Sequence, residues 1–246
     1  MAGCSGSTSN PATNPTEPTA TSPSGSSAPP AQHAWAIVAL GDSLPHGSNC
    51  DCTPYPDLTG VDLSARPERT VTVTNDAVGG YTTADVLAKL QSNSSVIDQV
   101  RSSDVVEIEI GANYLSYSAT CGTSVTCYEP TVLVVEKNLA TIVARVHELT
   151  TGHQVLVVLL DYWTVWLGGQ YAAAQGDTYV AAATEVPDQV NTVIKSTASM
   201  TNSACVDLRA AFKDRTTPMT KPTTWPPTAT TPAPPDMSRS QPQPWP

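Results

Sequence analysis

The feature that most constrains the fold is an alternation of short apolar runs with segments of helical periodicity between residues 34 and 212. The apolar runs have the length of buried strands, and we expect strands at 34–40, 70–75, 105–110, 154–160 and 205–208. Amphipathic helices are expected at 82–91, with Thr82 as N-cap, and at 131–149 and 178–199, with a bend at Pro187. This pattern predicts βαβ units, a parallel sheet and a three-layer α/β/α domain.

The two ends of the chain have compositions that do not support a folded core. Residues 5–33 are dominated by Ser, Thr, Pro, Ala, Gly and Asn, and we expect a flexible tether there. Residues 214–246 contain ten prolines and no Leu, Ile or Val, so we expect a disordered tail. The predicted organisation is therefore a start and tether at 1–33, a folded domain at 34–213 and a tail at 214–246.

The first four residues, Met1-Ala2-Gly3-Cys4, resemble the end of a bacterial lipoprotein signal, in which a cysteine after small residues receives a lipid. The basic and apolar regions of such a signal are missing, so we expect Met1 to be a misassigned start. The alternative is a chance cysteine in a disordered segment. The first interpretation predicts an extracytoplasmic protein, secreted or in a bacterial cell envelope, whose link to the membrane is a lipid on Cys4.

Charge and side-chain chemistry exclude several classes of partner. The formal net charge of −10 argues against binding to nucleic acid or to an anionic membrane surface. No stretch approaches the roughly 20 consecutive apolar residues of a membrane span. The spacing of Cys and His fits no zinc site, and we expect no metal, no organic cofactor and a monomeric chain.

Five cysteines lie within the predicted domain, at Cys50, Cys52, Cys121, Cys127 and Cys205. An exported protein can use such cysteines in disulfides. Cys121 and Cys127 bracket a short Gly/Ser/Thr-containing loop and would close a small ring. We expect a second disulfide between Cys205 and either Cys50 or Cys52, and the sequence does not choose between them.

Three predicted strands are followed by loops that could together form an acyl-transfer site. Ser43 follows the first strand, Gly80 the second and Asn113 the third. The carboxyl ends of parallel strands meet at one edge of a sheet, where open α/β sheets bind ligands. A serine hydroxyl can act as nucleophile, while a glycine N–H and an amide side chain can donate to an oxyanion. The alternative is that Gly-Asp-Ser forms an ordinary turn in which Ser43 caps a helix.

With Ser43, Gly80 and Asn113 in this order, residues from 34 to about 212 resemble the GDSL, or SGNH, hydrolase family. The resemblance implies a flavodoxin-like fold with five parallel strands in the order 2-1-3-4-5. It also implies a serine esterase or lipase that cleaves a small carboxylic ester of a lipid or carbohydrate through an acyl-serine intermediate. Ser43 would be the nucleophile, and its N–H, the Gly80 N–H and the Asn113 side chain would hold the oxyanion.

The chain departs from this family at two motifs. The third block usually reads Gly-x-Asn-Asp, but Tyr114 occupies the last position, so we expect altered loop packing with the oxyanion contact retained. The family carries its catalytic acid and base as Asp-x-x-His after the fifth strand, and this sequence has no such motif. No catalytic His or Asp is therefore identifiable.

The remaining acidic residues and histidines have other interpretations. The acidic side chains nearest to strand ends are expected to support loops; they are Asp42, Asp161 and Asp207. His46 is close to Ser43 in sequence, but neither it nor His33, His147 or His153 occupies the position of the family's base.

A frameshift would explain the missing motif. When the codons of residues 225–237 are regrouped by one base, the reading permits Asp-Gly-Asp-His-Pro, with an Asp at position 228 and a His at position 231. The alternative is a natural Pro/Thr-rich tail. We therefore expect an esterase with impaired activity, whose substrate choice depends on partly aromatic loops at 45–66, 115–129 and 162–177. The rival function is that of a noncatalytic envelope lipoprotein that binds a carbohydrate or lipid.

Overall fold

A computed structural model describes residues 34–48, 50–67 and 69–212 of this protein. Several predictions concern residues outside these ranges. They are the tether with Cys4 and His33, and the tail at 214–246 with the positions of the alternative reading frame.

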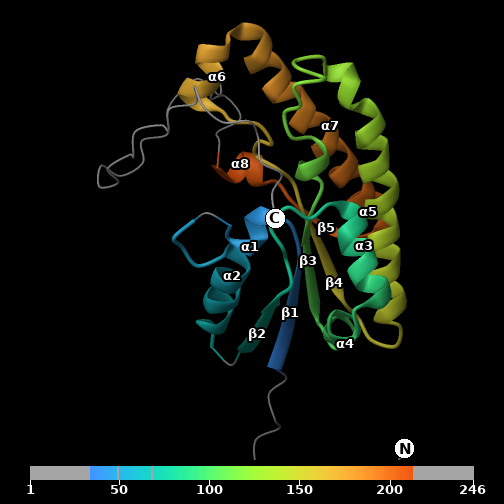
Figure 1. The fold of residues 1–246 in the computed structure, drawn as a ribbon. Helices are drawn as coiled ribbons and strands as arrows, with labels where there is room; N and C mark the ends of the chain where they lie inside the picture. The colour runs from blue at the N-terminus through green and yellow to red at the C-terminus, as the bar shows by residue number, and fades with distance from the viewer. Residues whose placement is uncertain (1–33, 49, 68, 213–246) are drawn as a thin grey trace, which may run out of the picture. The chain divides into compact units, whose positions relative to one another are not determined.

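The centre of the structure is a five-stranded sheet in the order β2-β1-β3-β4-β5, in which all four neighbouring pairs are parallel. The strands are β1 (Ala34–Gly41), β2 (Thr70–Asn75), β3 (Val105–Glu109), β4 (Leu156–Leu160) and β5 (Ala204–Val206). The predicted strand order is confirmed, and a strand forms at each predicted position. The carboxyl ends of β1, β2 and β3 therefore lie at one edge of the sheet (Figure 1).

Helices connect the strands and cover the sheet on both sides (Figure 1). They are α1 (Ser43–His46), α2 (Tyr55–Ser64), α3 (Thr83–Ser92), α4 (Ser94–Arg101), η1 (Ala112–Tyr114), η2 (Val125–Tyr128), α5 (Glu129–Leu149), α6 (Gly169–Gln175), α7 (Asp177–Thr201) and α8 (Leu208–Phe212). Helices α3, α5 and α7 confirm the three predictions, and Thr82 caps α3 through a capping box with Asp85. The sequence did not predict α2, because Pro56 and Gly60 interrupt its weak apolar pattern.

The main core lies between the sheet and the layer formed by α3, α4, α5 and α7 (Figure 1). The sheet contributes alternate residues of its strands, including Leu40, Ile108 and Leu159, and the helices contribute Leu90, Ile142 and Ile194. On the opposite face, Gly60 of α2 lies against Val73 of β2. These helices on the two faces give the predicted three-layer arrangement.

The α2 face of the sheet is less well covered toward β4 and β5. Leu160 of β4 pairs with Val206 of β5, so these two side chains lie on the same face of the sheet. Leu156 is four residues before Leu160 on β4 and therefore lies on that face too. Leu156 is 51% exposed and Val206 is 38% exposed. Burial of such side chains is favourable, so this end of the sheet retains apolar surface that the described residues do not cover.

The disulfide pairing corrects one prediction. Cys121 pairs with Cys127, as predicted, but Cys50 pairs with Cys52. Cys205 is an exposed free thiol, so its predicted bond to Cys50 or Cys52 is wrong. The reason is topological: Cys50 and Cys52 lie between α1 and α2, in the segment that connects β1 to β2, whereas Cys205 lies on β5 at the opposite edge of the sheet from β2.

Candidate active site

The loop that carries Ser43 is held tightly against β3. The backbone N–H of Asp42 donates to the carbonyl oxygen of Glu109 at 3.2 Å. A Cβ atom at Gly41 would lie 2.3 Å from that same oxygen and 2.5 Å from Pro45, so only glycine fits at this position. Ser43 is the first residue of α1 and is partly exposed. The strand end therefore presents the Ser43 side chain at a fixed place on the carboxyl edge of the sheet.

The buried side chain of Asp42 stabilises this loop through hydrogen bonds. Its side chain is only 1% exposed, and its carboxylate accepts hydrogen bonds from the Leu44 N–H and, at 2.7 Å, from the Tyr162 hydroxyl. Burial raises the pKa of Asp42, and these hydrogen bonds offset part of that effect. Tyr162 is fixed in turn by Asn191 of α7, whose amide bonds to both the N–H and the carbonyl of Tyr162. No local sequence pattern indicates a role for Tyr162, because it is 120 residues from Asp42 along the chain.

We expect Tyr162→Phe to destabilise the protein by about 2 kcal/mol, because a buried carboxylate loses a charge-assisted hydrogen bond. Urea unfolding at neutral pH would measure this. Tyr179→Phe is the matched control, since that hydroxyl donates only to the carbonyl of Leu167, at 3.3 Å. Equal losses of stability in the two variants would contradict a special contribution from the Asp42–Tyr162 bond.

The loop after β2, which carries Gly80, is attached to the end of β1, the strand that precedes Ser43. The Val78 N–H donates to the Gly41 carbonyl at 3.1 Å, which attaches the loop after β2 to the end of β1. Gly80, in this loop, has a φ of +84° and nothing within 4 Å of the place where a Cβ atom would lie. Glycine thus permits this conformation and leaves space beside the backbone.

Asn113 connects the third loop to the second. Its Nδ2 atom donates to the carbonyl oxygen of Tyr81, next to Gly80, at 2.7 Å. A side-chain amide has two N–H donors, so one remains for another acceptor. The structure thus brings together the loops of Ser43, Gly80 and Asn113, while the catalytic roles of these residues stay predictions. Tyr114 follows in η1 and is partly buried.

The histidines have other neighbours within the described part of the chain. The Nδ1 atom of His46 lies 2.8 Å from the Ser48 hydroxyl. His153 Nε2 lies 3.0 Å from the Ser103 carbonyl, just before β3 begins, and His147 is near the end of α5. These two positions are at the amino-terminal edge of the sheet. Among residues 34–48, 50–67 and 69–212, no hydrogen bond joins a histidine to Ser43.

Two glutamates of β3 lie on the α2 face beneath the site. Glu109 is fully buried, and burial together with the charge of Asp42 raises its pKa well above the usual range. Burial also raises the pKa of Glu107 to about 7. Central parallel strands are usually apolar, so two buried carboxyl groups on β3 could not be expected from the strand pattern. Protonation of these two glutamates removes the large free-energy penalty of burying a charge.

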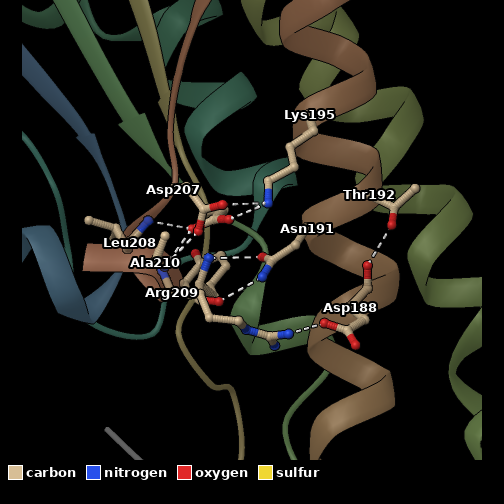
Figure 2. Close-up of polar contacts among 10 residues, drawn as sticks. Asp188, Asn191, Thr192, Lys195, Asp207, Leu208, Arg209 and Ala210 are labelled. Carbon is tan, nitrogen blue, oxygen red and sulfur yellow. Dashed lines mark hydrogen bonds and ion pairs between the residues drawn. The ribbon is translucent and has the colours of Figure 1, made fainter. Parts of the chain in front are cut away.

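Asp161 and Asp207 follow β4 and β5, as expected for strand-end residues. Lys195 of α7 lies 3.1 Å from the buried Asp161 carboxylate and 3.2 Å from that of Asp207. Asp161 also accepts a 2.7 Å hydrogen bond from the Leu208 N–H, and Arg209 pairs with Asp188 (Figure 2). This cluster joins α7 to the start of α8 and so fixes the direction in which the chain leaves β5.

Within the three described ranges, no group of His, Cys, Asp and Glu side chains is arranged to hold a metal ion. Nor does any helix of these ranges combine the length and apolar character required to span a bilayer.

Comparison with known proteins relates this geometry to a family. The GDSL-like Lipase/Acylhydrolase family matches residues 39–227, which include the three candidate site residues and part of the Pro/Thr-rich segment. No curated protein is significantly similar in sequence.

Several solved structures have a similar fold. A lipase from a goat rumen metagenome is 23% identical, with a TM-score of 0.55 over 74% of this chain and 84% of the other. An extracellular lipase from Streptomyces rimosus is also 23% identical, with a TM-score of 0.55 over 73% and 82%. AlinE4, an SGNH-hydrolase family esterase, is 19% identical, with a TM-score of 0.50 over 75% and 82%. These likenesses support the fold, and the family match over most of the sequence shows that this chain belongs to the GDSL-like lipase/acylhydrolase family.

Proposed function

We propose that this hydrolase-family chain cleaves carboxylic esters of lipids or carbohydrates, with Ser43 as nucleophile. The observation that carries the proposal is the hydrogen-bonded assembly of three loops at one sheet edge, with Asn113 joined to Tyr81 beside Gly80. In the reaction, Ser43 Oγ attacks the acyl carbon while its proton passes to a base. The N–H groups of Ser43 and Gly80 and the Asn113 amide stabilise the oxyanion.

The second half of the reaction restores the serine. Collapse of the tetrahedral intermediate breaks the bond to the alkoxy oxygen, the base returns the proton to that oxygen, and the alcohol departs to leave an acyl-serine. Water then attacks this ester, and the acid and free Ser43 are released. Both halves require a base, and the sequence contains no Asp-x-x-His block. We therefore propose that the chain in its present form is impaired, with the lost block encoded in the alternative frame.

A fluorophosphonate probe tests the nucleophile, because it phosphonylates activated serine hydroxyls. We expect slow labelling confined to Ser43, located by mass spectrometry, and no labelling of Ser43→Ala. The exposed Ser95 of α4 provides a control, since Ser95→Ala should label like the parent chain. Labelling that persists in Ser43→Ala would contradict the assignment.

The second candidate is a noncatalytic envelope lipoprotein that binds a carbohydrate or lipid on the same fold. The missing Asp-x-x-His block favours it. Absence of phosphonate labelling in both this chain and its frame-corrected form would support this candidate over the esterase.

We also propose an extracytoplasmic location with a lipid on Cys4. Support comes from the two disulfides, which persist mainly in oxidising compartments. Metabolic labelling with a palmitate analogue should mark the protein made from its full upstream sequence, and Cys4→Ala should abolish the label.

A further inference from the structure

A cluster of aromatic side chains beyond the carboxyl edge of the sheet encloses a cavity of about 360 Å³. We call it the aromatic pocket; its lining residues are Tyr117, Thr164, Val165, Trp166, Leu167, Tyr171 and Tyr179. The Tyr117 and Trp166 rings meet edge to face with centroids 5.2 Å apart, and Tyr179 lies 5.4 Å from Trp166. Its volume is at the small end of the usual range for ligand sites.

The chemistry of the lining favours a hydrocarbon over a sugar. None of the lining side chains carries a charge at neutral pH. The Trp166 indole N–H donates to the Leu115 carbonyl, the Thr164 hydroxyl to the Trp166 carbonyl, and the Tyr179 hydroxyl to the Leu167 carbonyl. These donors are thus already used within the protein. A sugar would lose its hydrogen bonds to water with few replacements, whereas an alkyl chain loses none.

The pocket is open to such a ligand. Tyr117 is 50% exposed and Leu167 is 66% exposed, so the pocket presents apolar surface to solvent. Covering this surface with an alkyl chain would remove apolar area from water on both partners.

Two hydrogen bonds link the segments that carry the pocket to the segments that carry the candidate site residues. Trp166 Nε1 lies 2.7 Å from the carbonyl oxygen of Leu115, which is two residues after Asn113. The loop that carries Trp166 begins at Tyr162, the hydrogen-bond partner of Asp42. These residues follow the carboxyl ends of β1, β3 and β4. However, Ser43, Gly80 and Asn113 do not line the pocket, so a short acetyl group at Ser43 would not fill it.

We propose that the aromatic pocket binds the aliphatic chain of an ester whose carbonyl carbon reacts at Ser43. This inference rests on the proposed function and narrows its substrate class to esters with an extended alkyl chain. The alkyl chain extends from the site into the pocket, where it lies against Tyr117 and Leu167. The acyl and alcohol portions of an ester can each supply such a chain.

Methyl ketones test the pocket independently of turnover, because they carry an ester-like carbonyl but no leaving group. Binding of 2-butanone, 2-hexanone and 2-decanone would be measured by ligand-observed NMR. We expect affinity to rise roughly three- to fourfold for each methylene that enters the pocket. Leu167→Ala should weaken 2-decanone binding about tenfold and leave 2-butanone binding unchanged. Leu58→Ala, on the exposed surface of α2, is the matched control and should change neither.

The outcomes separate the pocket from the proposed chemistry. An affinity independent of chain length, or equal effects of the two leucine variants, would overturn the pocket assignment. Tighter binding of methyl β-xyloside than of 2-decanone would also overturn it. Ser43→Ala should still bind 2-decanone while losing phosphonate labelling, so a failure of the nucleophile leaves this test intact. If Ser43 is labelled, phosphonates with an octyl group on phosphorus or on the alkoxy oxygen show which portion of the ester fills the pocket. Faster labelling with either than with the methyl analogues supports the proposal, and equal rates of labelling contradict it.

Discussion

Replacing residues 214–246 by their alternative-frame translation should raise p-nitrophenyl acetate hydrolysis by roughly 10³- to 10⁶-fold over the present chain. The reason is that the restored His would accept the proton of Ser43 Oγ, and the restored Asp would orient that His. In the present chain, Ser43 has the proposed oxyanion donors Gly80 and Asn113 but no identifiable base. p-Nitrophenyl acetate is a suitable substrate because hydrolysis of its short acetyl ester does not depend on the aromatic pocket.

Two controls distinguish catalysis from improved folding. The frame-corrected chain with Ser43→Ala, and the frame-corrected chain with alanine at the restored His, should both lose the gain in rate. Each keeps the restored segment, so both should remain as soluble as the corrected parent. Equal rates for the present and corrected chains would refute the proposed triad.

Glu107→Gln should stabilise the protein by about 3 kcal/mol above pH 7 and leave its stability unchanged near pH 4. The pKa of Glu107 is about 7 in the folded protein, against 4.5 ordinarily. Between these values the unfolded chain releases the proton and the folded chain keeps it. Unfolding thus becomes more favourable as pH rises from about 4.5 to 7, and the penalty is constant above that range.

Urea unfolding at several pH values between 4 and 8.5 would measure this effect. Glu109 has a raised pKa of the same physical origin, so the variant should show a reduced pH dependence rather than none. The exposed Glu136 of α5 provides the control, because Glu136→Gln should follow the wild-type curve. A Glu107→Gln variant with the wild-type pH dependence would show that Glu107 ionises normally in the folded state.

Much of the architecture could be predicted because its signals are local. The strand at 70–75 and the capping box that begins at Thr82 are each determined by a few neighbouring residues. The sheet order came from the family resemblance, which depended on Ser43, Gly80 and Asn113 in sequence. Helix α2 was missed because Pro56 and Gly60 obscure its periodicity, although Gly60 is what permits close contact with Val73.

The sequence by itself determined the strand positions, the parallel sheet and the three loops of the candidate site, since periodicity and turn residues act over short distances. Tertiary structure decided the partners of side chains far apart in the chain. The clearest examples are the bond from Tyr162 to Asp42, the contacts of Lys195 with Asp161 and Asp207, and the separation of Cys205 from Cys50. Such contacts depend on which elements the sheet order makes neighbours, and no local pattern encodes that. The same holds for the aromatic pocket, whose residues come from the segment after β3, the loop after β4 and the helices α6 and α7.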